Sequence, residues 1–442
     1  MKKDSSFFRA VCALASPAAL QSMLQSSFSI VDQLMIGQLG SVSIAGVGLA
    51  GKFVSLFSVV VSAVGTVAGI MLSQYLGQNN ACEVRRSFGV NLLLAGAVGA
   101  AFTVLCTLWP HTVMGLYTTD EAARQAAAEY LRIVSASLLP MAGSTLLATL
   151  LRCLQKPRLP LYASIASAIV NTVLNALFIF GGLGIAPMGA PGAAVATVTA
   201  QWVNFGLMLC MLPRQKAGAA DGAADAPFGW GQYLHMLLPI LICEGMWSVG
   251  DNVYAAIFGR MGIEASAAMT LTNPVQGLVI GALCGLSQAA SILVGRHLGQ
   301  QDFEEAYRDS RWLIRYGAVG ALLLSVLVVA FSPLYVRIYQ VEGSVRQLSR
   351  QLLIVYAIIS PFKVLNMILG GGIIRSGGQT HYTMWIDLSG TWLLGVPLGM
   401  VTAFVLEWSA PAVYLALSME EVLRFGITVC VFRKKRWMRV LG

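Results

Sequence analysis

The sequence predicts an all-α polytopic membrane protein: twelve transmembrane helices in two six-helix bundles related by a parallel pseudo-two-fold repeat. Three observations predict this fold: the composition, twelve long apolar runs, and a second half that repeats the first. Hydrophobic residues make up 57% of the 442 residues and charged residues 11%, against about 25% charged residues in soluble proteins. So much apolar surface cannot be hidden inside a water-soluble chain. The composition therefore excludes a disordered chain, a secreted disulfide scaffold and a cytosolic enzyme.

The apolar runs are long enough to cross a bilayer as helices. A span needs about 20 mostly apolar residues, and these runs are too long for the strands of a membrane barrel. The first run resembles a signal peptide, but it continues through Ile30, so we expect a retained span. The predicted spans cover residues 11–36, 44–76, 88–110, 125–151, 159–183, 190–212, 233–259, 266–297, 313–335, 346–374, 382–405 and 411–432.

The placement of Lys and Arg predicts the orientation of the spans. Twelve spans put both termini on one side, and 20 of the 29 basic residues lie at the termini or in the loops of that side, Arg375 among them. Because cytoplasmic loops are rich in Lys and Arg, we expect both termini to be cytoplasmic and the chain to lie in the plasma membrane. The net charge of +9 is then a topology signal. The lipid bilayer is an expected partner, and nucleic acid is not.

No sequence motif indicates metal, cofactor or nucleotide chemistry. The eight cysteines show no paired spacing and mostly lie in apolar runs, where Cys behaves as a small apolar residue. The four His lie near span ends, and no GxxxxGK[ST], HExxH or GxSxG motif occurs. We therefore expect no cofactor, no enzymatic activity and no direct use of ATP.

The two halves of the sequence match when one is shifted by 222 residues. The match has no gap from Pro17 to Arg86; VDQLMIGQLG aligns with VYAAIFGRMG, and SQYLGQNNACEVRR with GRHLGQQDFEEAYR. Six spans begin and end on the same side, so both copies have the same orientation. Paired bundles of this kind enclose a cavity, which we expect to open to each side in turn. A duplicated scaffold without a transport path is the alternative.

A polar stretch separates the two copies. Residues 214–232 read RQKAGAADGAADAPFGWGQ, without apolar periodicity, which is typical of flexible linkers. The predicted domains are an N-terminal six-helix bundle at residues 1–213, this cytoplasmic linker at 214–232, and a C-terminal six-helix bundle at residues 233–442.

The segment VDQLMIGQLGSVSIAGVGLA, its counterpart in the second half and the segment GAPGAAVATVTAQ resemble the multidrug and toxic compound extrusion (MATE) family. The resemblance covers nearly the whole chain and is closer to the bacterial DinF-like and NorM-like branches than to eukaryotic members. It implies export of organic cations and other amphipathic compounds, driven by inward flow of protons or sodium ions.

Asp32 in the first span is the strongest candidate for ion coupling. A charge at mid-bilayer costs at least about 2.5–3.5 kcal/mol, so an acid there marks a site. Burial opposes its ionisation and a nearby cation favours it, so Asp32 can exchange a proton or hold Na⁺. The resemblance places Asp32 at the family's first-helix acid position. A headgroup-level aspartate bonded to backbone amides is the alternative.

Span five supplies two amides, Asn171 and Asn175, which share one helix face. An amide can ligate a cation or hydrogen-bond a protonated aspartate. In the family the first-helix acid is paired with an Asn, matched here by Asn171. One branch adds an Asp where this chain has Asn175, so the missing charge implies a weaker cation site or a shorter proton relay. Thr197 resembles a threonine of the family near this site. The alternative for the two Asn is helix–helix bonding, and the alternative for Thr197 is a bond to a carbonyl of its own helix.

Span seven carries two acids and two aromatic residues close to one stripe. Glu244 and Asp251 are almost two turns apart, with Trp247 and Tyr254 near them. An acid beside an aromatic ring suits a cationic drug, so these four are the predicted substrate-binding residues, with packing as the alternative. A sodium-coupled branch of the family uses a span-seven Glu with a span-ten Asp. Span ten here has no acid and carries Lys363, so that sodium site is in doubt.

Further ionisable residues lie in the last two spans. Asp387 is expected near the membrane interface, paired with Arg375 or His381. Three residues of span twelve are expected to pair with one another: Glu420, Glu421 and Arg424.

These features predict a monomeric secondary-active multidrug exporter, a cation antiporter. It would move organic cations or amphipathic compounds out of the cell in exchange for inward H⁺ or Na⁺ by alternating access. The alternative is a lipid-linked oligosaccharide flippase of related architecture. Such a flippase needs several basic residues to hold pyrophosphate, whereas we expect the interior to be poor in them, with Lys363 the clearest candidate.

Overall fold

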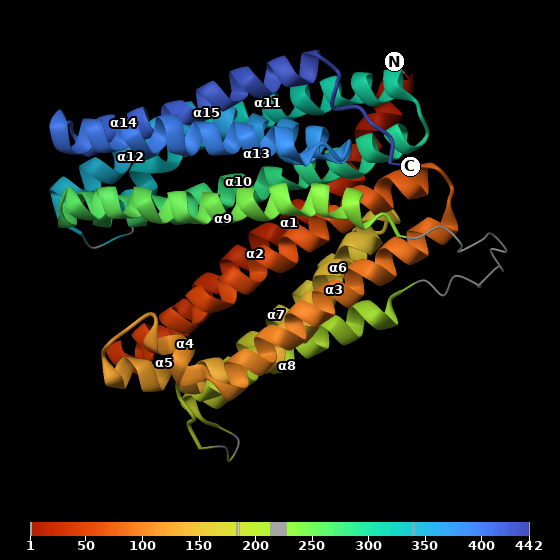
Figure 1. Ribbon diagram of the computed structural model, residues 1–442. Coiled ribbons are helices and arrows are strands. Elements are labelled where there is room, and N and C mark those ends of the chain that lie inside the picture. Colours follow the sequence, from red (N-terminus) through yellow and green to blue (C-terminus); the bar gives the residue numbers. More distant parts are fainter. Residues whose placement is uncertain are drawn as a thin grey trace. The chain divides into compact units, whose positions relative to one another are not determined.

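A computed structural model of the chain is all-helical, as predicted (Figure 1). It describes residues 2–182, 184, 186–212, 228–337, 339 and 341–441, without the side chains of 2–6, 29, 30 and 41. Within these residues, eleven helical segments are long and apolar enough to cross a membrane. The twelfth predicted span, α15 (Ala410–Arg433), is also long enough but carries Glu420, Glu421 and Arg424 near its middle. The chain is a multi-pass membrane protein.

The first half contains six long helical segments, one of which has a 3-10 turn inside it. Its elements are α1 (Lys2–Ile36), η1 (Gly37–Leu39), α2 (Ser41–Gly77), α3 (Ala81–Leu108), α4 (Pro110–Gly115), α5 (Glu121–Val134), η2 (Ser135–Ser137), α6 (Leu138–Cys153), α7 (Arg158–Phe180) and α8 (Ala190–Cys210). Side-chain caps define two helix starts: Asn80 accepts from the backbone N–H of Glu83 (3.1 Å), and Asp120 from that of Ala123 (2.8 Å).

The second half differs from the first by three π-helical segments. Its elements are α9 (Trp230–Arg260), α10 (Ile263–Gly299), α11 (Phe303–Arg337), α12 (Gly343–Asn366), η3 (Met367–Ile374), α13 (Thr380–Leu388), η4 (Ser389–Gly395), α14 (Val396–Met400), η5 (Val401–Val405) and α15. The segments η3, η4 and η5 are π-helical. Such turns are rare and often lie at functional sites.

The helices form two compact units. The C-terminal unit comprises Met1–Ala19, Ser73–Asn79 and Phe228–Gly442, and the N-terminal unit comprises Leu20–Leu72 and Asn80–Pro227. Helices α1 and α2 therefore each contribute to both units. Of the predicted linker, residues 214–227 lie outside the described residues.

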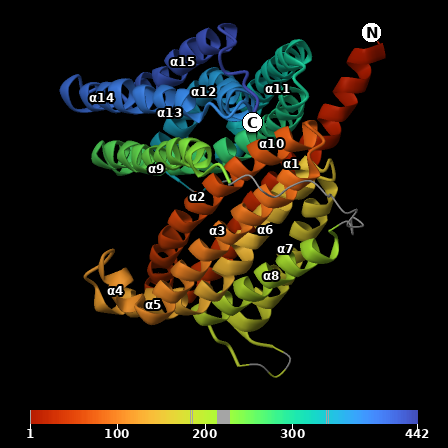
Figure 2. The same ribbon diagram turned by 45° about the vertical axis from the view of Figure 1, so that its right-hand side comes forward.

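Each unit is a set of helices packed along one another. In the N-terminal unit α7 packs along α8 and α3 along α6 (Figure 2). In the C-terminal unit α12 contacts α11 and α15, and α9 contacts α13. Large apolar side chains on α11 are exposed, for example Leu323 at 62% and Val326 at 67%, as a helix surrounded by lipid requires.

Two glycines related by the repeat let the end of α2 cross α10 within the C-terminal unit. A Cβ on Gly77 would lie 2.2 Å from the carbonyl oxygen of Arg296, and a Cβ on Gly299 would lie 2.1 Å from that of Gln74. Gly77 and Gly299 are 222 residues apart in the sequence, so each repeat presents the same glycine to the other's backbone. This reciprocal contact is what a two-fold relation between the repeats produces.

The segment after α15 folds back onto this crossing. Gln74 donates from Nε2 to the carbonyl oxygen of Ser376 (2.7 Å) and accepts at Oε1 from the backbone N–H of Leu441 (2.7 Å). Trp437 is fully buried and stacks on Phe432, with ring centroids 5.8 Å apart. The basic residues at 433–436 remain exposed.

Trp437→Ala is expected to lower the free energy of unfolding by about 3–5 kcal/mol, because it leaves a cavity where the buried indole ring was packed. Guanidinium unfolding in detergent micelles, followed by circular dichroism, measures the loss. Trp408→Ala is the matched control, because Trp408 is 47% exposed, and it should cost less than about 1 kcal/mol. Equal losses in the two variants would contradict a structural role for the segment after α15.

Candidate functional site

Four side chains meet around Asp32 inside the N-terminal unit. Asp32 lies on α1, Asn171 and Asn175 on α7, and Thr197 on α8. Asn175 donates from Nδ2 to Oδ1 of Asp32 (2.7 Å) and to Oδ1 of Asn171 (3.2 Å). Asn171 donates to Oγ1 of Thr197 (3.5 Å). The structure thus brings together the four residues predicted for the cation site.

The two amides of α7 hold the carboxylate from one side. Asn171 and Asn175 are one turn apart and share a face of α7. Turning the Asn171 amide by half a rotation places its nitrogen 2.9 Å from Oδ1 of Asp32, without changing the shape of the side chain. In that orientation Asp32 accepts hydrogen bonds from both amides. Where the sequence resemblance implied a second acid, Asn175 supplies a donor.

Asp32 has no basic neighbour among the described residues. The buried Tyr130 of α5 lies near Thr197 and within range of the Asp32 charge. Asn175 is 1% exposed, and its Oδ1 has no hydrogen-bond partner. Carboxylate, amide and hydroxyl oxygens therefore gather without a fixed positive charge. A proton on Asp32, or a hard cation such as Na⁺, would complete this arrangement.

Two cavities of the C-terminal unit are lined by the residues predicted to bind substrate. The larger, about 340 Å³, is lined by Glu244 and Trp247 and is called the Glu244 cavity here. The smaller, about 140 Å³, is lined by Asp251 and Tyr254 and is called the Asp251 cavity. The four predicted substrate-binding residues thus divide into two pairs. Two residues line both cavities: Lys363 and Glu421.

Arg375 directly follows the span that ends at Ile374, as predicted, but its side chain is largely buried and not exposed as in a loop. Its side chain is 11% exposed, and NH1 lies 3.1 Å from Oε1 of Glu244. It also lies 4.0 Å from Oδ2 of Asp387 and 3.3 Å from Sγ of Cys243. Sequence reasoning missed this burial, because Arg375 follows an apolar run and precedes a turn, as an exposed loop residue does. Arg375 comes directly after η3 and lines the Glu244 cavity.

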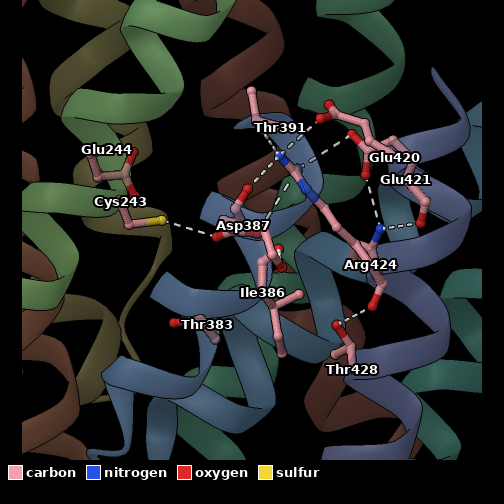
Figure 3. A network of polar contacts seen from close by, with 12 residues as sticks. Cys243, Glu244, Thr383, Ile386, Asp387, Thr391, Glu420, Glu421, Arg424 and Thr428 are labelled. Atoms are coloured by element: carbon pink, nitrogen blue, oxygen red, sulfur yellow. Dashed lines mark hydrogen bonds and ion pairs between the residues drawn. The ribbon is translucent and has the colours of Figure 1, made fainter. Parts of the chain in front are cut away.

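Arg424 lies at the centre of a network of carboxylates (Figure 3). Its guanidinium is 3.9 Å from Oδ1 of Asp387, 3.6 Å from Oε2 of Glu420 and 3.8 Å from Oε1 of Glu421. Thr391 of η4 accepts a further hydrogen bond from it. The side chain of Arg424 is 7% exposed, so the guanidinium is held almost entirely by these groups.

Neighbouring groups bind the outer oxygens of this network. Tyr254 donates its hydroxyl to Oε2 of Glu420 (2.8 Å), and Asn366 donates from Nδ2 to Oε2 of Glu421 (2.9 Å). Cys243 donates to Oδ2 of Asp387 (2.9 Å). Sequence reasoning missed these three contacts because they join helices far apart in the chain.

Two pairing predictions are confirmed, and one expectation is wrong. The span-twelve residues pair with one another as predicted, and Asp387 pairs with Arg375 rather than His381, which packs against His235 instead. The interior is not poor in basic residues, because Arg375 and Arg424 line the Glu244 cavity with Lys363.

In the part of the chain that the structure describes, no group of three or more His, Cys, Asp or Glu side chains could hold a metal.

Comparisons with known proteins agree with this architecture. The MatE family model matches residues 17–177 and again residues 239–401. A "Probable multidrug resistance protein NorM" from Thermotoga maritima is 23% identical, over 96% of this chain and 92% of the relative. "Multidrug resistance protein MdtK" from Yersinia enterocolitica is 24% identical, over 91% of this chain and 89% of the relative.

A solved structure supports the fold directly. The Vibrio cholerae MATE transporter VcmN in the bent form superposes with a TM-score of 0.87 at 16% identity, over 98% of both chains. The two matches of the family model start at residues 17 and 239, the same shift that aligns the two halves of the sequence. The all-helical architecture and the doubled match lead to one conclusion: the chain belongs to the MatE family of membrane transport proteins.

Proposed function

We propose that the chain is a secondary-active multidrug exporter of the plasma membrane, working as a monomer with both termini in the cytoplasm. It moves organic cations or amphipathic compounds outward in exchange for inward H⁺ or Na⁺ by alternating access. The names of its relatives as multidrug resistance proteins support the substrate class. The orientation follows from the excess of Lys and Arg on one side.

One observation carries the coupling proposal: Asp32 is an intramembrane carboxylate bonded to amides without a basic partner in the described part of the chain. Its charge is costly in the membrane, and a bound cation or proton removes that cost. When protonated, Asp32 becomes a donor, and the unpartnered Oδ1 of Asn175 is an available acceptor. Binding therefore changes both the charge and the hydrogen bonding of α1 against α7.

Ion binding drives transport only if it favours one conformation over the other. Moving an equilibrium from 1:99 to 99:1 requires a difference of about 5.5 kcal/mol in binding free energy. We propose that ion binding at four residues supplies this difference in binding free energy: Asp32, Asn171, Asn175 and Thr197. The substrate binds at the two cavities of the C-terminal unit, where Asp251 and Tyr254 meet its cationic group.

The structure places two further basic residues in the interior, Arg375 and Arg424, and a flippase would need such residues. Both are already engaged by carboxylates, Arg375 by Glu244 and Arg424 by Glu420 and Glu421. A pyrophosphate would have to break these pairs, which is costly at buried sites. Export of small amphipathic ions makes no such demand.

Proteoliposomes test the coupling. Efflux of a cationic dye from vesicles holding the full chain is expected under an imposed proton or sodium gradient alone, without ATP. Collapsing the gradient with an ionophore should stop efflux. Efflux that is unchanged by either gradient would refute secondary-active transport.

A further inference from the structure

Lys363 is a basic residue in a membrane span that the proposed ion coupling leaves unused. It lies on α12, one turn before the π-helical segment η3 begins at Met367. A lysine at such a depth is costly and marks a functional position. Lys363 lines both the Glu244 cavity and the Asp251 cavity, so whatever binds in either one meets its ammonium group.

The carboxylates near Lys363 are engaged by other groups. Two arginines, Arg375 and Arg424, hold four carboxylates around the cavities: Glu244, Asp387, Glu420 and Glu421. Within the described residues, Lys363 itself makes no ion pair and no hydrogen bond. Its ammonium group is therefore free to pair with a ligand, and only an anionic or strongly accepting group can satisfy it.

The Asp251 cavity offers a negative charge, which complements the positive charge of Lys363. Asp251 also makes no ion pair in the part of the chain that the structure describes. Four aromatic residues share the lining: Tyr254, Phe258, Tyr356 and Tyr414. An acid that lines a cavity together with aromatic rings favours an organic ammonium group through both charge and cation–π attraction.

We propose that the two cavities together bind a zwitterionic amphiphile. Its anionic group, a carboxylate or a phosphate, pairs with Lys363, and its ammonium group enters the Asp251 cavity. The proposal rests on the proposed export function and narrows its substrate class. Lys363 is the specificity-determining residue, because a purely cationic compound brings a second positive charge beside an ammonium that has no anion.

The Glu244 cavity provides room for the body of such a compound. Trp247, Ile280 and Met367 give it apolar surface. Gly370 and Gly371 of η3 leave the backbone bare along another part of its lining. A ring system of a soluble amphiphile can lie there while its two charged groups reach Lys363 and Asp251.

Binding of a matched dye pair to the purified full chain tests this inference. Rhodamine B carries a cationic ring system and a free carboxylate, and its ethyl ester lacks only the negative charge. By fluorescence anisotropy in detergent, wild type is expected to bind rhodamine B at least about tenfold more tightly than the ester. Lys363→Gln should abolish this preference without weakening the ester, and Lys363→Arg should retain it. Equal affinities in wild type, or equal weakening of both dyes by Lys363→Gln, would overturn the proposal.

Two controls distinguish a soluble zwitterion from a bound lipid, and substrate selection from ion coupling. Phospholipid headgroups share the zwitterionic chemistry, so phosphatidylethanolamine is added to the micelles; displacement of rhodamine B that depends on Lys363 would overturn the assignment to a soluble compound. The assay uses no gradient, and Asp32→Asn should keep the dye preference. Absence of gradient-driven export by wild type, with an intact dye preference, would refute the proposed function and leave this inference standing, whereas coupled export by wild type without the preference would refute this inference alone.

Discussion

Asp32→Asn is expected to reduce gradient-driven dye efflux at least about 100-fold, because it removes the charge at which we propose that the coupling ion binds. The amide has nearly the shape of the carboxylate and can still bond to Asn175, which donates to Asp32 over 2.7 Å. The helices should therefore pack as before. Initial efflux rates from proteoliposomes, at matched protein content, measure the effect.

Glu129→Gln is the matched control for this prediction. Glu129 is an exposed acid on α5 of the same unit, so its neutralisation should leave efflux within about twofold of wild type. Size-exclusion profiles of both variants should match wild type. Normal efflux by Asp32→Asn would remove this carboxylate from the mechanism, whatever the gradient used.

Arg424→Met is expected to lower the free energy of unfolding by about 3–5 kcal/mol, because it leaves buried carboxylates without their positive partner. The substitution keeps much of the side-chain volume but removes the charge that faces Asp387, Glu420 and Glu421. Those carboxylates would then repel one another in a buried place. Denaturant unfolding in detergent micelles gives the measurement.

A compensating variant separates charge from packing at this network. Adding Glu420→Gln and Glu421→Gln to Arg424→Met removes the repulsion and should recover part of the lost stability, since the penalty comes from uncompensated charge. Arg433→Met at the end of α15 is the control, because Arg433 is exposed. If the triple variant is less stable than Arg424→Met alone, packing and not charge accounts for the loss.

The site around Asp32 was largely predictable from the sequence. Asn171 and Asn175 are spaced one turn apart, which places them on one face of α7 whatever the tertiary fold. An acid in an apolar run also stands out in the sequence, because a charge inside the membrane is costly. The bond from Asn175 to Asp32 joins residues 143 positions apart, and only the family resemblance indicated that pairing in advance.

The C-terminal cavities were less predictable. Glu244 and Asp251 were correctly placed on one stripe of α9, but seven residues advance about 10 Å along a helix, so the stripe passes two cavities instead of one. Arg375 was correctly placed directly after its span, but counting loop charges cannot reveal that its side chain is largely buried against Glu244. The local sequence of η3, MILGGGII, gives no periodic signal for a π-helical turn.

The length of η3 has a consequence of its own for how this protein diverges from its relatives. A π-helical turn holds one more residue than an α-helical turn. Deleting a single residue there can be absorbed by closing the wide turn to an ordinary α-helical one, so Arg375 would keep its direction toward Glu244. This stretch is therefore a place where the span can gain or lose a residue without moving the charge that faces the Glu244 cavity.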